Sequence, residues 1–184
     1  MPICFRWLWD CLGPFDLDAM ASERSVQCNP NGAPLPFYSR FMCPVLPGLP
    51  RLQFLGDFTS CHGVDVFSQR WDGVAYIFPP LQDPWDVLQH LKAERLSAVV
   101  LVYHEPSGAW PHYEAAATYF GLPPLLVAKA GSAVLRFWHH KTFTRTRDAA
   151  AAWLPLPGGT PFDLFAYHLP FGRRTKRTRS ISKS

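Results

Sequence analysis

The sequence predicts an α/β domain with three layers and a mostly parallel sheet. Two observations carry this prediction. Segments with strand patterns alternate with segments with helical patterns along the chain, which favours strands joined by crossover helices. The run SAVVLVYH at 97–104 is continuously apolar and rich in β-branched residues, as is typical of a central strand covered on both faces. The 184 residues, 48% of them hydrophobic, provide for one domain with a core.

The first half of the chain begins with helical spacing of apolar residues at 4–12, which ends at Gly13-Pro14. The next segment, PFDLDAMAS, predicts a strand with Asp18 near its end. Proline-rich residues 28–60 predict an irregular insertion within the domain. Two further segments, GVDVFSQRW and GVAYIF, predict a short strand with a turn and a second strand, at 63–71 and 73–78.

The second half contains the clearest helix, at 83–96. Asp83 is expected at the N-cap and Pro84 at the first helical position, with Trp85, Leu88 and Leu91 on one face. Four more segments follow the central strand: a helix that begins after Pro111 and ends at Gly121, a hairpin or two short strands within 124–138, a short alanine-rich helix after 147, and an extended stretch at 162–169.

Charge divides the chain into a domain at 1–171 and a basic tail at 172–184. The formal net charge is +4, from 18 basic and 14 acidic residues, and six of the basic residues lie in the tail: Arg173, Arg174, Lys176, Arg177, Arg179 and Lys183. The domain therefore lacks the broad basic character of a strong phosphate binder. We expect the tail to be disordered. It is suited to DNA or RNA contacts, to nuclear targeting or to phosphorylation, and a translated end without any role is the alternative.

Cysteine usage and the apolar runs predict an intracellular protein without a membrane span. The five cysteines form no Cys-x-x-Cys pair, which favours reduced thiols over a disulfide framework or a zinc site. The apolar run at the N-terminus is interrupted by Arg6 and Asp10, unlike a signal peptide. The pairs Cys61-His62 and His139-His140 lack metal-ligand spacing.

Three features fall at the predicted carboxyl ends of strands, where α/β sheets bind ligands. They are Asp18, Asp65 and the corner Phe78-Pro79-Pro80-Leu81. Each also has a purely structural interpretation. Asp18 suits a cap of the following turn, Asp65 suits bonds to nearby backbone amides, and Phe78 suits the core beside a rigid corner.

The order of short segments between Phe5 and Ala117 resembles the phage-type DNA adenine methyltransferases and the related domain in the polyproteins of DIRS-like retroelements. The segments are FDLDAMAS, FYSRF, VDVFSQRW, YIFPPL, a helix, AVVLVYHEP and WPHYE. The resemblance implies a Rossmann-like methyltransferase core. It also implies S-adenosylmethionine as the cofactor, with Asp18 and Asp65 at the cofactor-binding positions, and a target base that leaves its stack.

The chain departs from this family at the catalytic loop. The active pattern has Asn or Asp before the two prolines and an aromatic residue after them, whereas this chain has Phe78 and Leu81. Phe78 cannot accept a hydrogen bond from an amine, and Leu81 has no ring to stack on a base. We therefore expect a degenerate, non-catalytic module of retroelement type that binds no cofactor. The alternatives are an active adenine methyltransferase in which Asp65 or Asp83 replaces the lost group, and a structural or non-functional translated fragment.

Overall fold

The computed structural model describes residues 3–21, 25–39, 61–80, 83–138 and 153–171. Within these ranges the α-helices are α1 (Ile3–Leu12), α2 (Pro84–Glu94) and α3 (Trp110–Phe120), and a short 3-10 helix covers Val66–Ser68. The strands are β1 (Leu17–Asp18), β2 (Phe37–Ser39), β3 (Cys61–Val64), β4 (Val74–Ile77), β5 (Ser97–Tyr103), β6 (Leu125–Ala128), β7 (Arg136–Trp138), β8 (Trp153–Pro155) and β9 (Leu164–Pro170).

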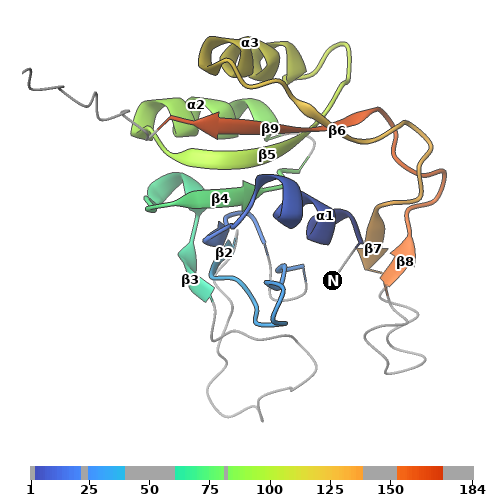
Figure 1. Ribbon diagram of the computed structural model, residues 1–184, viewed down its shortest axis with the longest axis horizontal. Coiled ribbons are helices and arrows are strands. Elements are labelled where there is room, and N and C mark those ends of the chain that lie inside the picture. Colours follow the sequence, from blue (N-terminus) through green and yellow to red (C-terminus); the bar gives the residue numbers. More distant parts are fainter. Residues whose placement is uncertain (1–2, 22–24, 40–60, 81–82, 139–152, 172–184) are drawn as a thin grey trace, which may run out of the picture.

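Seven of these strands form one mixed sheet in the order β3-β2-β1-β4-β5-β9-β6, which Figure 1 shows from β9 and β6 down to β3. β1 to β5 are parallel to one another. β9 is antiparallel to both of its neighbours, β5 and β6. Six strands therefore point one way, and the carboxyl ends of β1, β3, β4 and β5 meet at one edge of the sheet. We call this the carboxyl edge.

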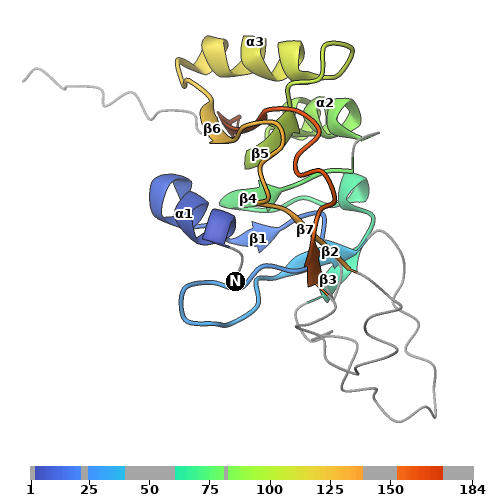
Figure 2. The same cartoon turned by 90° about the vertical axis from the view of Figure 1, so that its right-hand side faces the viewer.

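Helices cover both faces of the sheet and make three layers (Figure 2). One core cluster joins α2 and α3 to the sheet through Leu88, Leu91 and Tyr113. The other cluster joins α1 to the opposite face through Phe5 and Leu8. Side chains of β5 alternate between the two clusters, with Ala98, Val100 and Val102 in the first and Val99 and Leu101 in the second. This alternation is the two-residue period of a strand buried on both faces.

The α/β class, the mostly parallel sheet and the central strand at 97–104 are confirmed. The helices predicted at 4–12, at 83–96 and after Pro111 are found within two residues of their expected starts. Gly121 ends α3 with a φ of 69°, a backbone conformation that glycine adopts without strain. Residues 124–138, which were expected to form a hairpin or two short strands, form two short strands. These strands belong to different sheets, since β6 pairs with β9 and β7 pairs with β8. They are not a hairpin.

Two further expectations differ from the structure. Residues 37–39 form β2 inside the segment expected to be irregular, and β2 lies between β1 and β3 in the sheet. Trp85 was placed on the buried face of α2, but it is 42% exposed, and Val87 takes its place beside Leu88 and Leu91. The side chain of Asp83 makes no capping hydrogen bond to α2, although Asp83 occupies the N-cap position. The alanine-rich helix was predicted for residues that lie outside the described ranges.

Candidate functional site

The three sequence-predicted features lie on the carboxyl edge of the same sheet. Asp18 is the last residue of β1, Asp65 follows β3, and Phe78 follows β4. Strands β1 and β4 are direct neighbours, whereas β3 lies two strands beyond β1. At a strand spacing of ~4.8 Å, β3 is roughly 10 Å from β1 and roughly 14 Å from β4. Asp18 and the proline corner are therefore adjacent, and Asp65 lies at the periphery.

Asp18 is a buried carboxylate at the end of β1. It is 3% exposed, and its Oδ2 accepts a hydrogen bond of 2.9 Å from the backbone N–H of Gln27. Burial raises the pKa of Asp18 to about 7, and the hydrogen bond from Gln27 acts in the opposite direction. The protonated and ionised forms of this side chain are therefore both populated near neutral pH. A carboxyl group of raised pKa at this edge is a candidate for a functional role.

The side chain of Gln27, the residue whose backbone N–H binds Asp18, contains a buried amide oxygen. Its Nε2 donates to the carbonyl of Ser25 at 2.9 Å, whereas its buried Oε1 has no hydrogen-bond partner among the residues that the structure describes. Buried acceptors without a partner are costly and rare. Gln27 is the one polar group here that sequence patterns did not single out, because nothing in its local sequence predicts that it meets Asp18.

Asp65 has a structural role. Its side chain accepts a hydrogen bond of 3.2 Å from the backbone N–H of Phe67 and caps the short helix at Val66–Ser68. Its φ is 57°, in the left-handed region that Asp tolerates better than most residues. The side chain is exposed. Its carboxylate is therefore engaged in local structure and does not point to a shared site with Asp18.

The proline corner is filled by apolar groups. Phe78 is half-buried and packs with the α1 cluster, and its ring lies 6.1 Å from the ring of Tyr103 at the end of β5. Burial raises the pKa of Tyr103 to about 12, so the hydroxyl stays neutral. Pro79 is buried. Leu81 lies outside the described residues.

The cavity at this corner is small. It is lined in part by Pro79, Pro80, Tyr103 and Ala109, and its volume is about 20 Å³. That volume suits about one water molecule. Ligand pockets typically enclose several hundred Å³, so a nucleobase does not fit into this cavity.

A cluster of aromatic side chains surrounds His104, directly after β5, and we call it the histidine cluster. Sequence patterns did not predict it. The ring of His104 stacks on Phe165 of β9 at 3.8 Å and on Trp110 of α3 at 4.6 Å. Its Nε2 is 2.8 Å from the hydroxyl of Tyr167. Burial lowers the pKa of His104, and the negative charges of Glu114 and Asp163 oppose this. The cluster ties β5 to β9 across 63 residues of sequence, a distance at which no local pattern can predict a contact.

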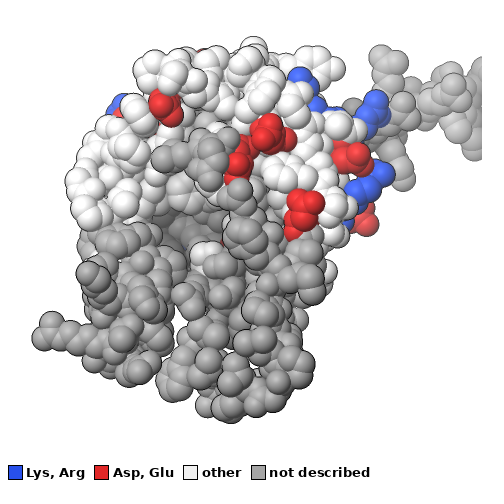
Figure 3. Space-filling model, turned by 180° about the vertical axis from the view of Figure 1, so that it is seen from behind, with Lys and Arg blue, Asp and Glu red and all other residues white. Residues whose placement is uncertain are grey.

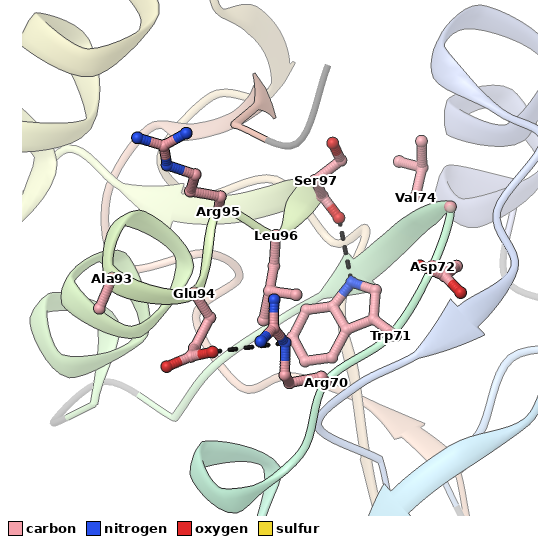
Figure 4. A pocket seen from close by; sticks show the side chains of 10 residues that line it. Arg70, Trp71, Asp72, Val74, Ala93, Glu94, Arg95, Leu96 and Ser97 are labelled. Carbon is pink, nitrogen blue, oxygen red and sulfur yellow. Dashed lines mark hydrogen bonds and ion pairs between the residues drawn. The ribbon is translucent and has the colours of Figure 1, made fainter. Parts of the chain in front are cut away.

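A larger depression of about 650 Å³ lies at the opposite edge, at the amino ends of β4 and β5 (Figure 4). Two pairs of its lining residues interact with each other. Arg70 Nε is 3.4 Å from Glu94 Oε2, and Trp71 Nε1 donates to the carbonyl of Ser97 at 3.2 Å. The depression lies away from the edge at which parallel sheets bind ligands, so it does not belong to the candidate site.

The described residues contain no group of three or more His, Cys, Asp or Glu side chains that could hold a metal ion. Within the same ranges, no helix is long and apolar enough to cross a membrane. His139, His140 and the six basic residues of the tail lie outside the described residues. Comparison with protein-family models, with curated proteins and with solved structures finds nothing that matches this chain.

Proposed function

We propose that this chain is a degenerate adenine-methyltransferase-like module of retroelement type, which performs no methyl transfer and associates with nucleic acid through its basic tail. The observation that carries the proposal is the corner at the end of β4. Its two prolines are held beside β5, but Phe78 packs on Tyr103 where an amine-binding group would stand. Two prolines at a strand end, without a polar side chain at position 78, support a loop of this type that has lost its activity.

The order of the strands supports the methyltransferase-like part of the proposal. β3-β2-β1-β4-β5 follows the doubly wound order of dinucleotide-binding folds. The antiparallel β9 extends this order between β5 and β6. The chain reverses its strand order between β1 and β4, which is where Asp18 and Phe78 lie.

The residues at this edge do not fit S-adenosylmethionine. Asp18 is 3% exposed, its Oδ2 is engaged by Gln27, and Asp18 lines neither of the two cavities described above. The unpartnered Oε1 of Gln27 supplies one acceptor, which alone does not make a cofactor site. These contacts of the described residues support the proposed absence of methyl transfer.

Calorimetric titration with S-adenosylmethionine, followed by a methylation assay on adenine-containing DNA, tests the proposal. We expect no binding heat and no methyl transfer. Tight cofactor binding together with methylated adenine would refute the non-catalytic assignment. The part that concerns the tail has a separate test, in which binding of the chain to duplex DNA and to RNA is measured at rising salt. Contacts by the six cations should weaken steeply as salt rises.

The alternative of an active methyltransferase now depends on Asp83 more than on Asp65. The carboxylate of Asp65 caps a helix at β3, whereas Asp83 lies three residues after Pro80, and its backbone N–H bonds to the carbonyl of Pro80. Asp83 is thus the carboxylate next to the proline corner. If methyl transfer is observed, the Asp83→Asn variant should abolish it, and the Asp65→Asn variant should retain it.

A further inference from the structure

We propose that the basic tail of this chain docks intramolecularly on a track of exposed or half-buried aromatic and acidic side chains along α3 and the first turn of α2. The track is defined by Phe120, Tyr119, His112 and Trp85, with Asp83 and Asp86 beside its far end. This inference goes beyond the proposed function and does not depend on it.

The track begins where the tail begins. The ring of Phe171, the last described residue before the tail, lies 4.9 Å from the ring of Phe120 at the end of α3. Phe120 in turn contacts Tyr119 at 5.0 Å, and Tyr119 is 84% exposed. The chain therefore enters the tail directly beside an exposed aromatic ring.

The track continues along one face of α3 to its first turn. His112 precedes Tyr119 by seven residues, or two helical turns, so the two side chains share a face. The exposed ring of His112 lies 4.2 Å from the ring of Trp85 in α2, and Trp85 is 42% exposed. The hydroxyl of Tyr113 donates to the carbonyl of Pro84, which fixes the two helix starts against each other. The aromatic pair is thus held rigidly in place.

The charges along the track are those that attract a basic segment. Asp83 and Asp86 flank Trp85, and α3 contains Glu114 but no Lys or Arg. Figure 3 shows the face that α2 covers, where acidic side chains occupy the centre and most cations gather at one side. Guanidinium and ammonium groups bind favourably over exposed aromatic rings, whereas the carboxylates repel a phosphate backbone. The track consequently suits Arg and Lys side chains better than nucleic acid.

The tail is long enough to reach the far end of the track. Its 13 residues at 172–184 span up to about 43 Å when extended. From Phe120 back to His112 the helix rises only about 12 Å. Arg173 to Arg179 therefore can lie over Tyr119, His112 and Trp85 in turn. A docked tail would have its cations occupied, so docking and nucleic-acid binding would compete.

Trypsin cleavage within the tail of the full chain, followed by mass spectrometry at low salt, tests the docking. A docked tail is cleaved only when it is released, so the cleavage rate reports the released fraction. We expect the variant Asp83→Asn/Asp86→Asn and the variant Trp85→Leu each to be cleaved about tenfold faster than the original chain. High salt should increase the rate at which trypsin cleaves the tail of the original chain. The same salt should change the cleavage rate of the Asp83→Asn/Asp86→Asn variant less.

The matched control removes two exposed carboxylates elsewhere, with the variant Asp10→Asn/Asp72→Asn. Its cleavage rate should stay that of the original chain. Equal acceleration in the control would show that only overall charge matters, and an unchanged rate in both track variants would also overturn the proposal. Protection that increases with protein concentration would mean docking between copies, and this too would overturn the intramolecular assignment.

Discussion

The ends of β1 and β4 lie side by side in the sheet, yet their side chains differ in polarity. The end of β4 is apolar, with Phe78 packed on Tyr103 and Pro79 buried. The end of β1 holds a carboxylate, Asp18, that is nearly inaccessible to solvent. One strand end is held by apolar packing, and its neighbour contains a polar group whose ionised form is disfavoured by burial.

The two strand ends therefore have opposite effects on the stability of the fold: the end of β4 stabilises it, and the end of β1 destabilises it. Apolar contacts at Phe78 favour the fold at every pH. Asp18 destabilises the fold once it is ionised, because burial raises its pKa to about 7 from 3.8. Groups that lower stability at the edge of a sheet are often retained for a function. Of the two strand ends, the one that contains Asp18 is therefore the stronger candidate for a functional role.

The largest effect is expected at Asp18. The unfolded chain ionises Asp18 near pH 4 and the folded chain only near pH 7, so the free energy of unfolding should fall as pH rises through this window. The Asp18→Asn variant removes the buried charge and can retain the hydrogen bond from Gln27. We expect it to be more stable by roughly 2–4 kcal/mol at about pH 8.5 and by little at about pH 4.5. Urea unfolding at the two pH values measures this.

At the neighbouring strand end, the Phe78→Ala variant should lose about 2 kcal/mol, because the half-buried ring leaves its contacts in the α1 cluster. The loss should not depend on pH. A double-mutant cycle with Tyr103→Ala should give a coupling of about 1 kcal/mol for the ring pair. If the Phe78→Ala variant is as stable as the original chain, the corner is not held by packing.

A smaller loss is expected at the histidine cluster. The Tyr167→Phe variant removes the hydroxyl that lies 2.8 Å from His104 Nε2 and should cost about 1 kcal/mol in urea unfolding. The matched variant Tyr119→Phe removes an exposed hydroxyl from α3 and should cost nothing measurable. Equal losses in both variants would argue against a specific bond to His104.

The smallest effect is expected at Asp65. The Asp65→Asn variant keeps both the capping acceptor and the tolerance for a positive φ, so its stability should change by less than about 0.5 kcal/mol at any pH. It is the control for Asp18→Asn, because the same substitution is made at the same edge of the sheet. A pH-dependent gain at Asp65 would mean that its carboxylate is not simply a cap.

Local sequence patterns predicted the elements whose formation depends on interactions between residues close in the sequence. The apolar run at 97–104 marks β5, and Pro84 and Gly121 mark the boundaries of helices. They missed β2, because its three residues stand in a proline-rich segment and become a strand only by pairing with β1 and β3. Trp85 was misplaced because periodicity alone does not distinguish a ring in the core from one at its margin.

The candidate site was predicted in outline only. Three strand ends were expected to share an edge, and the parallel pairing of β1 to β5 places them there. The order of the strands, which separates Asp65 from Asp18, is a property of the whole chain. The same holds for the contact of Gln27 with Asp18 and for the stacking of His104 on Phe165. Whether the corner belongs to a methyltransferase-like module stays a prediction.

The position of β9 also constrains how the protein is made. β9 comes last among the strands, yet it fills the space between β5 and β6 and pairs with all seven residues of β5. When only the residues before Leu164 have emerged from the ribosome, β5 of the nascent chain therefore has an unpaired, apolar edge. Such edges recruit other chains, so a nascent chain should depend on chaperones until β9 has emerged. Any shortened chain that ends before β9 should aggregate.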